Sequence, residues 1–380
     1  MKFPLSLYIH IPWCVKKCPY CDFNSHAQRG ALPEKEYSDQ LMLDLESQLQ
    51  AVQDRPIHSI FIGGGTPSLF SPEAYADIFS RLKKYIAFEK EIEITLEANP
   101  GATEAEKFKG FFEAGINRIS IGVQSFQDHQ LKILGRIHES QHAKNAVIQA
   151  QQAGFQKINI DLMFGLPNQT VDDALFDLQT AIDLSPSHLS WYQLTLEPNT
   201  YFHRFPPTLP DDDYRFEIQQ AGQQLLRDNG FDQYEISAYT KKDFCKHNMN
   251  YWLFGDYLGI GAGAHAKFTD LLSMQVTRRS NTKHPVKYLS LHPKNNTETF
   301  SHTKIISKDE LPLEFMMNAL RLFQPIPITL FEARTGLPFA TIEKKISEAV
   351  SHQLMCIENK CMVVTDRGYL FLNELLEMFM

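Results

Sequence analysis

Residues 5–21 read LSLYIHIPWCVKKCPYC, an apolar run followed by three cysteines. The run Leu5–Ile11 has the β-branched and aromatic composition of a buried strand. The cysteines follow with the spacing Cys14-X3-Cys18-X2-Cys21, and two prolines around them favour an extended loop. This stretch therefore predicts a strand whose carboxyl end leads into a loop that bears three thiols.

Five further β-rich runs follow along the chain, and a helix-period segment lies between each pair. These runs are Ser59–Ile62, Glu91–Leu96, Arg118–Val123, Lys157–Met163 and His188–Leu194. Six strand–helix repeats are typical of parallel strands joined by right-handed crossovers. We therefore predict an α/β fold around a parallel sheet, although periodicity alone does not say whether the sheet closes.

Ligands of such folds collect at the carboxyl ends of the strands. The sequence places a Gly63-Gly64-Gly65-Thr66 turn at that edge, next to the cysteine loop. Glycine has no Cβ and tolerates positive φ, so this turn lets the backbone approach a ligand closely. Glu97 and Asp161 also lie at strand ends, where a carboxylate beside a core needs a partner.

The three cysteines predict an iron–sulfur cluster. Such clusters are usually held by four thiolates, so three ligands on one loop suit a [4Fe–4S] cubane with one iron open. An open iron can chelate the amino and carboxylate groups of S-adenosylmethionine (SAM). The alternative is zinc with His10 or His26 as the fourth ligand, but this spacing is unusual for structural zinc.

Composition restricts the class of protein. The 380 residues include 37 basic and 45 acidic side chains, which leaves no positive excess for a phosphate backbone and argues against a nucleic-acid partner. Three of only six cysteines cluster in one loop, which favours a ligand set in a reducing compartment over disulfides. With no signal-like or membrane-spanning apolar run, we expect a cytoplasmic protein.

The CX3CX2C loop, the glycine-rich strand end and the strand order resemble the radical SAM superfamily, whose members reductively cleave SAM to a 5′-deoxyadenosyl radical. Within it, essentially the whole chain resembles the oxygen-independent coproporphyrinogen III oxidase-like group. The resemblance implies a partial (β/α)6 TIM-like barrel. It also implies that Cys14, Cys18 and Cys21 bind the [4Fe–4S] cluster.

The SAM contacts that the resemblance implies are carried over motif by motif. They are Gly64, Gly65 and Thr66 in GGGTP for the methionine amino group, Tyr8 in YIHIP, Tyr20 in CPYC, Glu97 in LEANP, Gln124 in GVQS, Arg136 in LGR and Asp161 in NIDLM. Without the resemblance, Tyr8 would equally be strand packing and Arg136 a surface cation.

Two features depart from the oxidases of this group. Their further cysteine, two residues after the third cluster ligand, is Phe23 here. Residues 247–252 instead read HNMNYW, the HNXXYW signature of heme chaperones in this group, and His247 is the expected axial heme ligand. A histidine beside asparagine is also often a hydrogen-bond hub, Trp252 suits a core position, and His265 suits the wall of the SAM pocket.

These departures favour a heme chaperone that binds the cluster, SAM and heme and delivers heme to a respiratory hemoprotein. The alternative is a coproporphyrinogen III dehydrogenase, which decarboxylates propionates oxidatively; a third reading, an RNA-modifying enzyme, conflicts with the acidic balance. Peripheral membrane contact through the recipient and a homodimer are both compatible with the sequence.

We expect three parts along the chain. Residues 1–200 form the barrel core with the cluster and SAM sites, and residues 201–305 form a barrel-covering extension with the HNXXYW segment. Residues 306–380 form a small helix-rich, winged-helix-like accessory domain, with a turn at Glu358-Asn359-Lys360. The last two parts are expected to close over the open end of the barrel, because a radical needs shielding from water.

Overall fold

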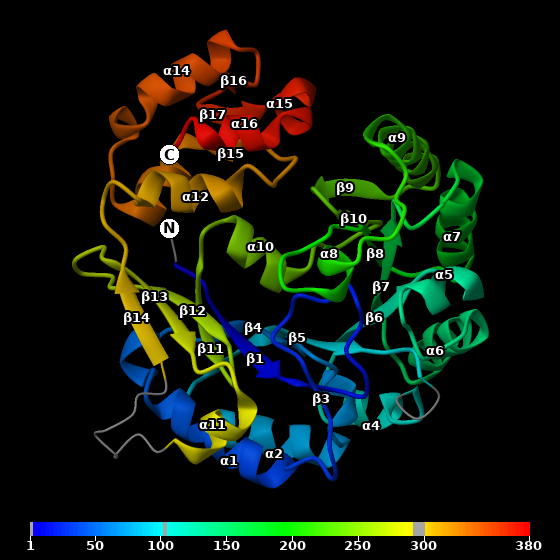
Figure 1. Ribbon diagram of the computed structural model, residues 1–380. Coiled ribbons are helices and arrows are strands. Elements are labelled where there is room, and N and C mark those ends of the chain that lie inside the picture. The colour runs from blue at the N-terminus through cyan, green and yellow to red at the C-terminus, as the bar shows by residue number, and fades with distance from the viewer. Residues whose placement is uncertain (1–2, 102–104, 292–300) are drawn as a thin grey trace.

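The computed structural model describes residues 3–101, 105–291 and 301–380. Within these residues, one sheet holds twelve strands in the order β14-β13-β12-β11-β1-β4-β5-β6-β7-β8-β10-β9 (Figure 1). Its strands are β1 (Leu5–Ile11), β4 (Ile57–Gly64), β5 (Phe88–Ala98), β6 (Arg118–Gln124), β7 (Lys157–Phe164), β8 (His188–Gln193), β9 (Asp232–Glu235), β10 (Ala238–Thr240), β11 (Asp256–Ile260), β12 (His265–Thr269), β13 (Val276–Asn281) and β14 (Ser301–Ile305).

The six predicted strands are β1 and β4 to β8, which lie side by side and parallel. The predicted partial barrel is confirmed: the sheet curves, and helices cover its outer face (Figure 1). The helices that follow these strands are α1 (Glu34–Glu46), α2 (Pro72–Leu82), α4 (Phe108–Glu113), α5 (Asp128–Ile133), α6 (Ser140–Gln152), α7 (Val171–Asp183), α8 (Tyr201–Arg204) and α9 (Asp212–Asp228).

Local sequence explains where these helices begin and which face they bury. Ser71 caps α2 by accepting a hydrogen bond from the Ala74 N–H at 3.2 Å, and proline occupies the first helical position. The buried residues of α2 are Tyr75, Ile78, Phe79 and Leu82, which follow the i, i+3, i+4, i+7 spacing of one helical face. That face packs on strands buried on both sides, as parallel strands between helices are.

Residues 201–305 extend the sheet at both ends. β11 lies parallel to β1, and β12 to β14 follow it antiparallel, while β10 and β9 continue the sheet beyond β8. The six-strand prediction did not include these strands. Their residues are interrupted by glycine at 259–263 or are polar with no clear period, so pattern alone does not reveal them.

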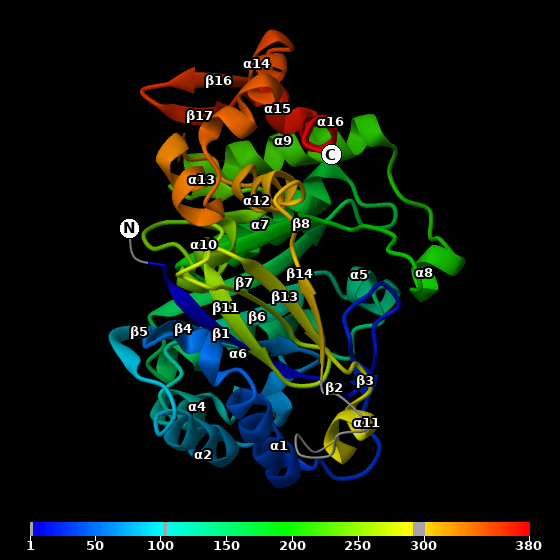
Figure 2. The ribbon, with the colours of Figure 1, turned by 90° about the vertical axis from the view of Figure 1, so that its left-hand side faces the viewer.

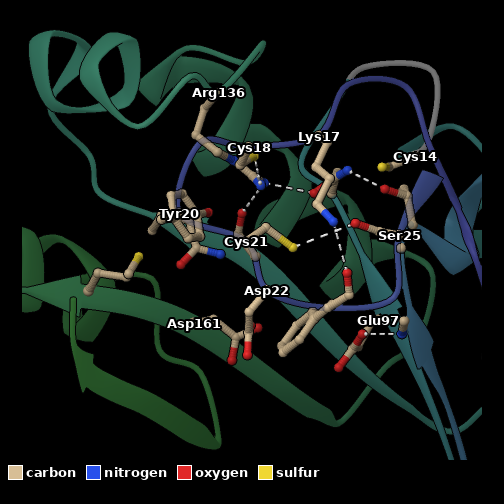
Figure 3. A pocket seen from close by; sticks show the side chains of 18 of the residues that line it. Cys14, Lys17, Cys18, Tyr20, Cys21, Asp22, Ser25, Glu97, Arg136 and Asp161 are labelled. Atoms are coloured by element: carbon tan, nitrogen blue, oxygen red, sulfur yellow. Dashed lines mark hydrogen bonds between the residues drawn. The ribbon is translucent and has the colours of Figure 1, made fainter. Parts of the chain in front are cut away.

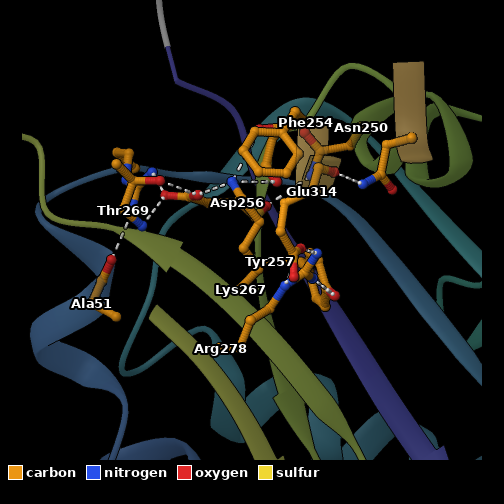
Figure 4. Close-up of polar contacts among 12 residues, drawn as sticks. Ala51, Asn250, Phe254, Asp256, Tyr257, Lys267, Thr269, Arg278 and Glu314 are labelled. Carbon is orange, nitrogen blue, oxygen red and sulfur yellow. Dashed lines mark hydrogen bonds and ion pairs between the residues drawn. The ribbon is translucent and has the colours of Figure 1, made fainter. Parts of the chain in front are cut away.

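A buried ion-pair network anchors β11 and β12 (Figure 4). The Asp256 carboxylate accepts hydrogen bonds from Lys267 at 2.9 Å, from the Thr269 hydroxyl at 2.9 Å and from Arg55 at 2.7 Å. Burial lowers the pKa of Lys267 to about 8, opposed by Asp256. Because each charge has a partner, the network is stable inside the protein, whereas removing one partner would leave a buried charge.

The C-terminal region is helical with a small sheet, as predicted. It contains α12 (Leu311–Ala319), β15 (Ile326–Pro327), α13 (Ile328–Thr335), α14 (Glu343–Ser351), β16 (Met355–Glu358), β17 (Cys361–Val364), α15 (Asp366–Leu370) and α16 (Leu372–Glu377). The expected turn at residues 358–360 joins β16 to β17, which pair antiparallel.

The C-terminal region does not close over the carboxyl ends of the strands, contrary to our expectation. Arg334 lies over the ring of Phe3, just before the amino end of β1. The region also contacts strands near both ends of the open sheet: Glu314 binds Arg278 of β13, beside the edge strand β14, and Arg321 binds Glu235 of the edge strand β9. Figure 2 shows it on the side away from the cysteine loop. None of the described helices is long and apolar enough to cross a bilayer.

Candidate functional site

A cavity of about 470 Å³ opens at the carboxyl ends of the parallel strands (Figure 3). The cysteine loop forms one wall, and the ends of β4 to β8 form the floor. The structure brings together eleven of the predicted site residues at this cavity: Cys14, Cys18, Cys21, Tyr20, Gly64, Gly65, Thr66, Glu97, Gln124, Arg136 and Asp161. The roles assigned to them stay predictions.

A short strand pairing and a backbone hydrogen bond hold the cysteine loop in place. Cys14 ends β2 (Trp13–Cys14), which pairs with β3 (His26–Ala27), and the Cys21 N–H donates to the Cys18 carbonyl at 3.2 Å. All three thiols are free of disulfides. Burial raises the pKa of Cys14 and Cys21, so both are protonated thiols in this loop. Binding of a metal centre would therefore release protons.

The donor set fits an iron–sulfur cluster better than zinc. Within the described chain, no three His, Cys, Asp or Glu side chains lie close enough to share one metal ion. Cluster cysteines bind separate irons and need not meet at one point. His10 offers zinc no free nitrogen, because Nε2 donates to the Asn24 carbonyl at 2.9 Å and Nδ1 accepts from the Tyr8 hydroxyl at 3.1 Å. His26 Nε2 also contacts the Asn24 side chain, at 3.2 Å.

The glycine turn is required by packing as well as by any ligand. A Cβ on Gly65 would lie 2.4 Å from the Trp13 carbonyl oxygen, so only glycine fits against the cysteine loop. The Gly65 and Thr66 N–H groups donate to the carbonyls of Ile11 and Trp13, each at 2.7 Å. These donors are therefore already used, and a ligand amino group, itself a donor, would bind carbonyl oxygens here.

Two carboxyl groups face the cavity from β5 and β7. Glu97 accepts from the Gly64 N–H at 3.1 Å, and Asp161 accepts from the Ser120 hydroxyl at 2.9 Å. Burial, and next the nearby Asp161, raise the pKa of Glu97 to about 8. Burial also raises the pKa of Asp161. A cationic ligand would lower both pKa values, so the pair suits a positively charged molecule.

Arg136 connects the cysteine loop to the floor of the cavity. One Nη donates to the Asn99 side chain and to the Gly122 carbonyl, each at 2.7 Å, and the other lies 3.6 Å from Cys18 Sγ. Its Nε is buried without a hydrogen-bond partner among the described residues. When Cys18 holds a metal centre, this guanidinium would pair with the charge of the bound sulfur. The orphaned Nε offers a donor to a bound anionic group.

Gln124 marks local backbone strain at the cavity. Its φ is +72°, in the left-handed region that residues other than glycine rarely adopt, and the β6–β7 register shifts between Gly122 and Gln124. The bulge turns its side chain toward β8, where the Tyr192 hydroxyl donates to it at 2.7 Å. Strain of this kind is typical of functional sites.

Sequence reasoning missed several cavity residues. They are Asn99, which directly follows β5, and Ser120, Met163, Ser190 and Tyr192, which lie on strands that were correctly predicted. The alternation of side chains along a strand could have identified Ser120 and Ser190. Each lies two residues before another cavity residue, Gly122 or Tyr192, and therefore points to the same face of the sheet.

Tyr8 does not line this cavity. It lies deeper on the inner face of the barrel, with its ring stacked on Phe61 at a centroid distance of 6.4 Å and its hydroxyl on His10. This arrangement is the strand packing that we considered as the alternative. A direct contact between Tyr8 and SAM therefore stays a prediction.

His247 also lies away from the cavity, on α10 (Lys246–Trp252), which plugs the amino-terminal end of the barrel (Figure 1). It is fully buried; Nδ1 contacts the Ser59 hydroxyl at 3.2 Å, and Nε2 contacts the Tyr251 hydroxyl at 2.9 Å. Burial lowers its pKa to about 3. With both nitrogens in hydrogen bonds, His247 acts as a hub, and ligation of heme iron by it would require α10 to move.

Comparison with known proteins agrees with this geometry. Residues 8–179 match the model of the radical SAM superfamily, and residues 306–371 match that of the HemN C-terminal domain. The solved coproporphyrinogen III oxidase HemN of Escherichia coli superposes with a TM-score of 0.83, over 100% of this chain and 90% of that one. At 22% sequence identity, this likeness shows the fold alone.

Two relatives that match along their whole length identify the family within this superfamily. The chain is 53% identical to the heme chaperone HemW of Haemophilus influenzae and 47% identical to that of Escherichia coli. Each match covers 99% of this chain and 98% of the relative. The match to the radical SAM model, together with the parallel sheet and the cysteine-lined cavity at its carboxyl edge, defines a radical SAM protein. Within that superfamily, the chain belongs to the HemW family.

Proposed function

We propose that this chain is a heme chaperone, which binds a [4Fe–4S] cluster, SAM and heme and delivers heme to respiratory hemoproteins. The observation that carries the proposal is its identity of 53% and 47%, over 99% of the chain, to two relatives named heme chaperone HemW. Phe23, 59% exposed at the rim of the cavity, supports a chaperone without oxidase activity, because the oxidases have a cysteine there.

Cys14, Cys18 and Cys21 would hold the cluster. When bound, it supplies one iron without a protein ligand, which can bind the amino and carboxylate groups of SAM. The carbonyl oxygens of the glycine turn would accept hydrogen bonds from the amino group of the methionine part of SAM. Glu97 and Asp161 would receive the ribose hydroxyls and balance the sulfonium charge.

The chain's own residues would then exclude water from this site. The Phe202 N–H donates to the Pro19 carbonyl at 2.9 Å, so α8 holds the cysteine loop from the side. Tyr20 is packed against Phe202 with 6.5 Å between ring centroids. This apolar cover would shield the cluster from solvent and oxygen.

The cluster assignment is tested by reconstituting the full chain without oxygen. We expect about four irons per chain and visible absorbance that bleaches on reduction. Cys18→Ser should lose most of the iron, because it removes one of three ligands. Cys356→Ser, a thiol of the C-terminal region, should retain it. Zinc instead of iron, or full iron in Cys18→Ser, would contradict the assignment.

The chaperone proposal is tested on the same reconstituted sample. We expect hemin to bind at about one per chain and to move to an apo-hemoprotein, and coproporphyrinogen III to remain unchanged. Turnover of coproporphyrinogen III without hemin binding would return the chain to the dehydrogenases, and Phe23 would then need another explanation.

The recipient is proposed only as a class. A respiratory hemoprotein would bring the chain to a membrane surface, so we expect peripheral contact through the recipient and no contact with nucleic acid. A cytoplasmic location and a homodimer also belong to this proposal. Flotation with and without a membrane-bound recipient would test the peripheral membrane contact. Sedimentation equilibrium would test the homodimer.

A further inference from the structure

A chain of hydrogen-bonded side chains leads from the cavity floor toward the amino-terminal end of the barrel. It begins at Asp161 and passes through Asn159 of β7 and His188, the first residue of β8, to Tyr234 of β9. Asn159, His188 and Tyr234 are almost fully buried. The proposed binding of the cluster and SAM uses none of these three side chains, so their presence in the core needs its own explanation.

Asp161 receives one donor on each carboxyl oxygen. The Ser120 hydroxyl donates to Oδ2 at 2.9 Å, and Asn159 Nδ2 donates to Oδ1 at 2.7 Å. The same nitrogen also donates to the Ser120 oxygen at 2.7 Å. An ionised carboxylate can only accept, so the amide nitrogen of Asn159 must face it and the amide oxygen must point away.

The orientation of Asn159 fixes the proton on His188. The amide oxygen of Asn159 lies 2.6 Å from His188 Nδ1 and also accepts from the Ser190 hydroxyl at 3.1 Å. Because this oxygen can only accept, Nδ1 must carry a proton. Burial, and next the charge of Arg118, lower the pKa of His188 well below its usual value. The ring is therefore neutral, and its Nε2 has no proton.

Tyr234 completes the chain. Its hydroxyl lies 2.7 Å from His188 Nε2, and it must donate because that nitrogen can only accept. The Cys245 N–H, at the start of α10, donates to the same hydroxyl oxygen at 3.5 Å. Every bond in the chain therefore has one direction, and all of its donors point toward Asp161.

This order favours one form of Asp161. Hydrogen bonds to a carboxylate stabilise its ionised form, which opposes the burial that raises the pKa of Asp161. The remaining lone pairs of Asp161 can then accept from the hydroxyl groups of a ligand in the cavity or balance its positive charge (Figure 3). Glu97, the other carboxyl group of the pair, accepts from the Gly64 backbone and from no side chain of the described residues.

Stability alone does not require such a chain. Apolar side chains of similar shape can fill the space of a buried polar group without loss of stability. A polar network that is satisfied at every step makes its members rigid and gives them one orientation. Because this network ends at the cavity, the side chain that it orients is Asp161.

We propose that His188 is a positioning residue of the SAM site: its Nδ1 proton orients the Asn159 amide, which holds Asp161 as an acceptor for the ribose hydroxyls or the sulfonium charge. Tyr234 keeps the imidazole in this tautomer. The inference rests on the proposed binding of SAM and deepens it. Neither His188 nor Tyr234 lines the cavity, and neither belongs to a motif that predicted a SAM contact.

The test compares two substitutions at position 188 by titrating SAM into the cluster-reconstituted full chain without oxygen. His188→Asn places an amide N–H near the position of Nδ1 and can still donate to Asn159. His188→Leu has the same branched shape without a donor. We expect His188→Asn to bind SAM within about threefold of wild type and His188→Leu to bind it at least about tenfold more weakly, the effect of losing a hydrogen bond to a charged group.

Both substitutions remove the ring and its bond to Tyr234, so a purely structural role predicts equal effects. Equal SAM affinities of the two variants would overturn the inference and leave the proposed function standing. If wild type binds no SAM, both fall. Tyr369→Phe removes a hydroxyl that donates to the Leu322 carbonyl in the C-terminal region, and it should leave SAM affinity unchanged.

Nitrogen NMR of the histidine side chains in the full chain gives a second readout, which needs no variant at position 188. His188 should show a proton on Nδ1 and none on Nε2. Tyr234→Phe, which removes the donor to Nε2, should identify the signal by shifting it. A proton on Nε2 in wild type would reverse the order of donors and overturn the proposal, even if SAM binds.

Discussion

At the scale of single residues, Gly64 joins the floor of the cavity to the strand beside it. Its φ is +120°, and a Cβ there would lie 2.7 Å from His10 Cε1. Gly115 is a matched control, with a φ of +106° and nothing within 4 Å of a Cβ. Both alanine substitutions carry the strain of positive φ, about 1 kcal/mol.

Gly64→Ala adds a collision to that strain. We expect it to lower the free energy of unfolding by about 2 kcal/mol more than Gly115→Ala, because the neighbouring strand must shift. Urea unfolding of the two variants measures the difference. Equal losses of unfolding free energy in the two variants would mean that the end of the strand moves aside at little cost. Glycine at position 64 would then be needed only for ligand binding.

Glu97 predicts a pH dependence of SAM binding. With a pKa of about 8, roughly one-tenth of this carboxyl group is ionised at pH 7. A sulfonium cation favours the ionised form, so SAM affinity should rise several-fold between pH 7 and about 8.5, and binding at pH 7 should take a proton off Glu97. Calorimetry in buffers of different ionisation enthalpy measures this proton.

Glu97→Gln provides the control. Glutamine retains an acceptor for the Gly64 N–H, so the turn should keep its shape while the titrating group is removed. The difference in pH profile between the two proteins isolates Glu97 from the titration of SAM itself. Parallel profiles would show that the carboxyl group does not sense the ligand.

At the scale of elements, α10 closes the amino-terminal end of the barrel with an uncharged histidine. Burial lowers the pKa to about 3 for His247 and His138 and to about 4 for His10. The unfolded chain binds these protons near pH 6.5, so the contribution of these three histidines to stability is complete above that pH and is lost as pH drops toward 4. At pH 5 each histidine should cost about 2 kcal/mol relative to pH 7.

Denaturant unfolding at pH 7 and pH 5 measures this loss. His247→Gln keeps a polar side chain on α10 and removes one titrating group, so the change in unfolding free energy between pH 7 and pH 5 should differ from that of wild type by about 2 kcal/mol in favour of the variant. An unchanged slope would mean that α10 opens to water before the rest of the chain unfolds.

The sequence predicted those elements well whose hydrophobic pattern is clear within the segment itself. Leu5–Ile11 has the predicted bounds because an apolar run between turn signals has few alternatives. The strand Val276–Asn281 escaped prediction, since its order depends on pairing with distant segments and its residues are mostly polar. For the same reason, the position of His247 inside the barrel could not be read from the HNXXYW motif.

At the scale of the whole molecule, the C-terminal region shares a core with the sheet edge. Phe315 of α12 is fully buried and packs on Phe254, which precedes β11, at 5.7 Å between ring centroids. Phe254 and Val276 belong to the same apolar cluster as the C-terminal helices. The division of the chain into three parts therefore stays a prediction.

Because the C-terminal region and the sheet edge share one apolar core, we expect the whole chain to unfold in one cooperative transition. Phe315→Ala should lower stability by about 3–5 kcal/mol and should shift the fluorescence transition of Trp13 and Trp191, which lie in the barrel core. Val350→Ala, on the exposed side of α14, should change it by less than about 1 kcal/mol. Unfolding of the C-terminal region before the tryptophans respond would show that it is a separate folding unit.

The site was largely predictable because its residues follow successive strands. Cys14 and Glu97 come shortly after predicted strands and Asp161 lies near the end of one, and parallel strands bring such positions to one edge. A smaller cavity lined in part by His265 and Arg321 was not predictable, because these residues come from different regions and only tertiary packing brings them together.

The pairing of β1 with β11 sets an order of events during synthesis. Leu5 lies opposite Asp256, and at about 5–20 residues per second the ribosome needs about 10–50 s to make the intervening chain. Throughout that interval the cysteine loop is attached to a strand with one side unpaired. The carbonyls of Ala262 and Lys283, which accept hydrogen bonds from the Asn24 side chain and so hold the loop from that side, are made only after that interval.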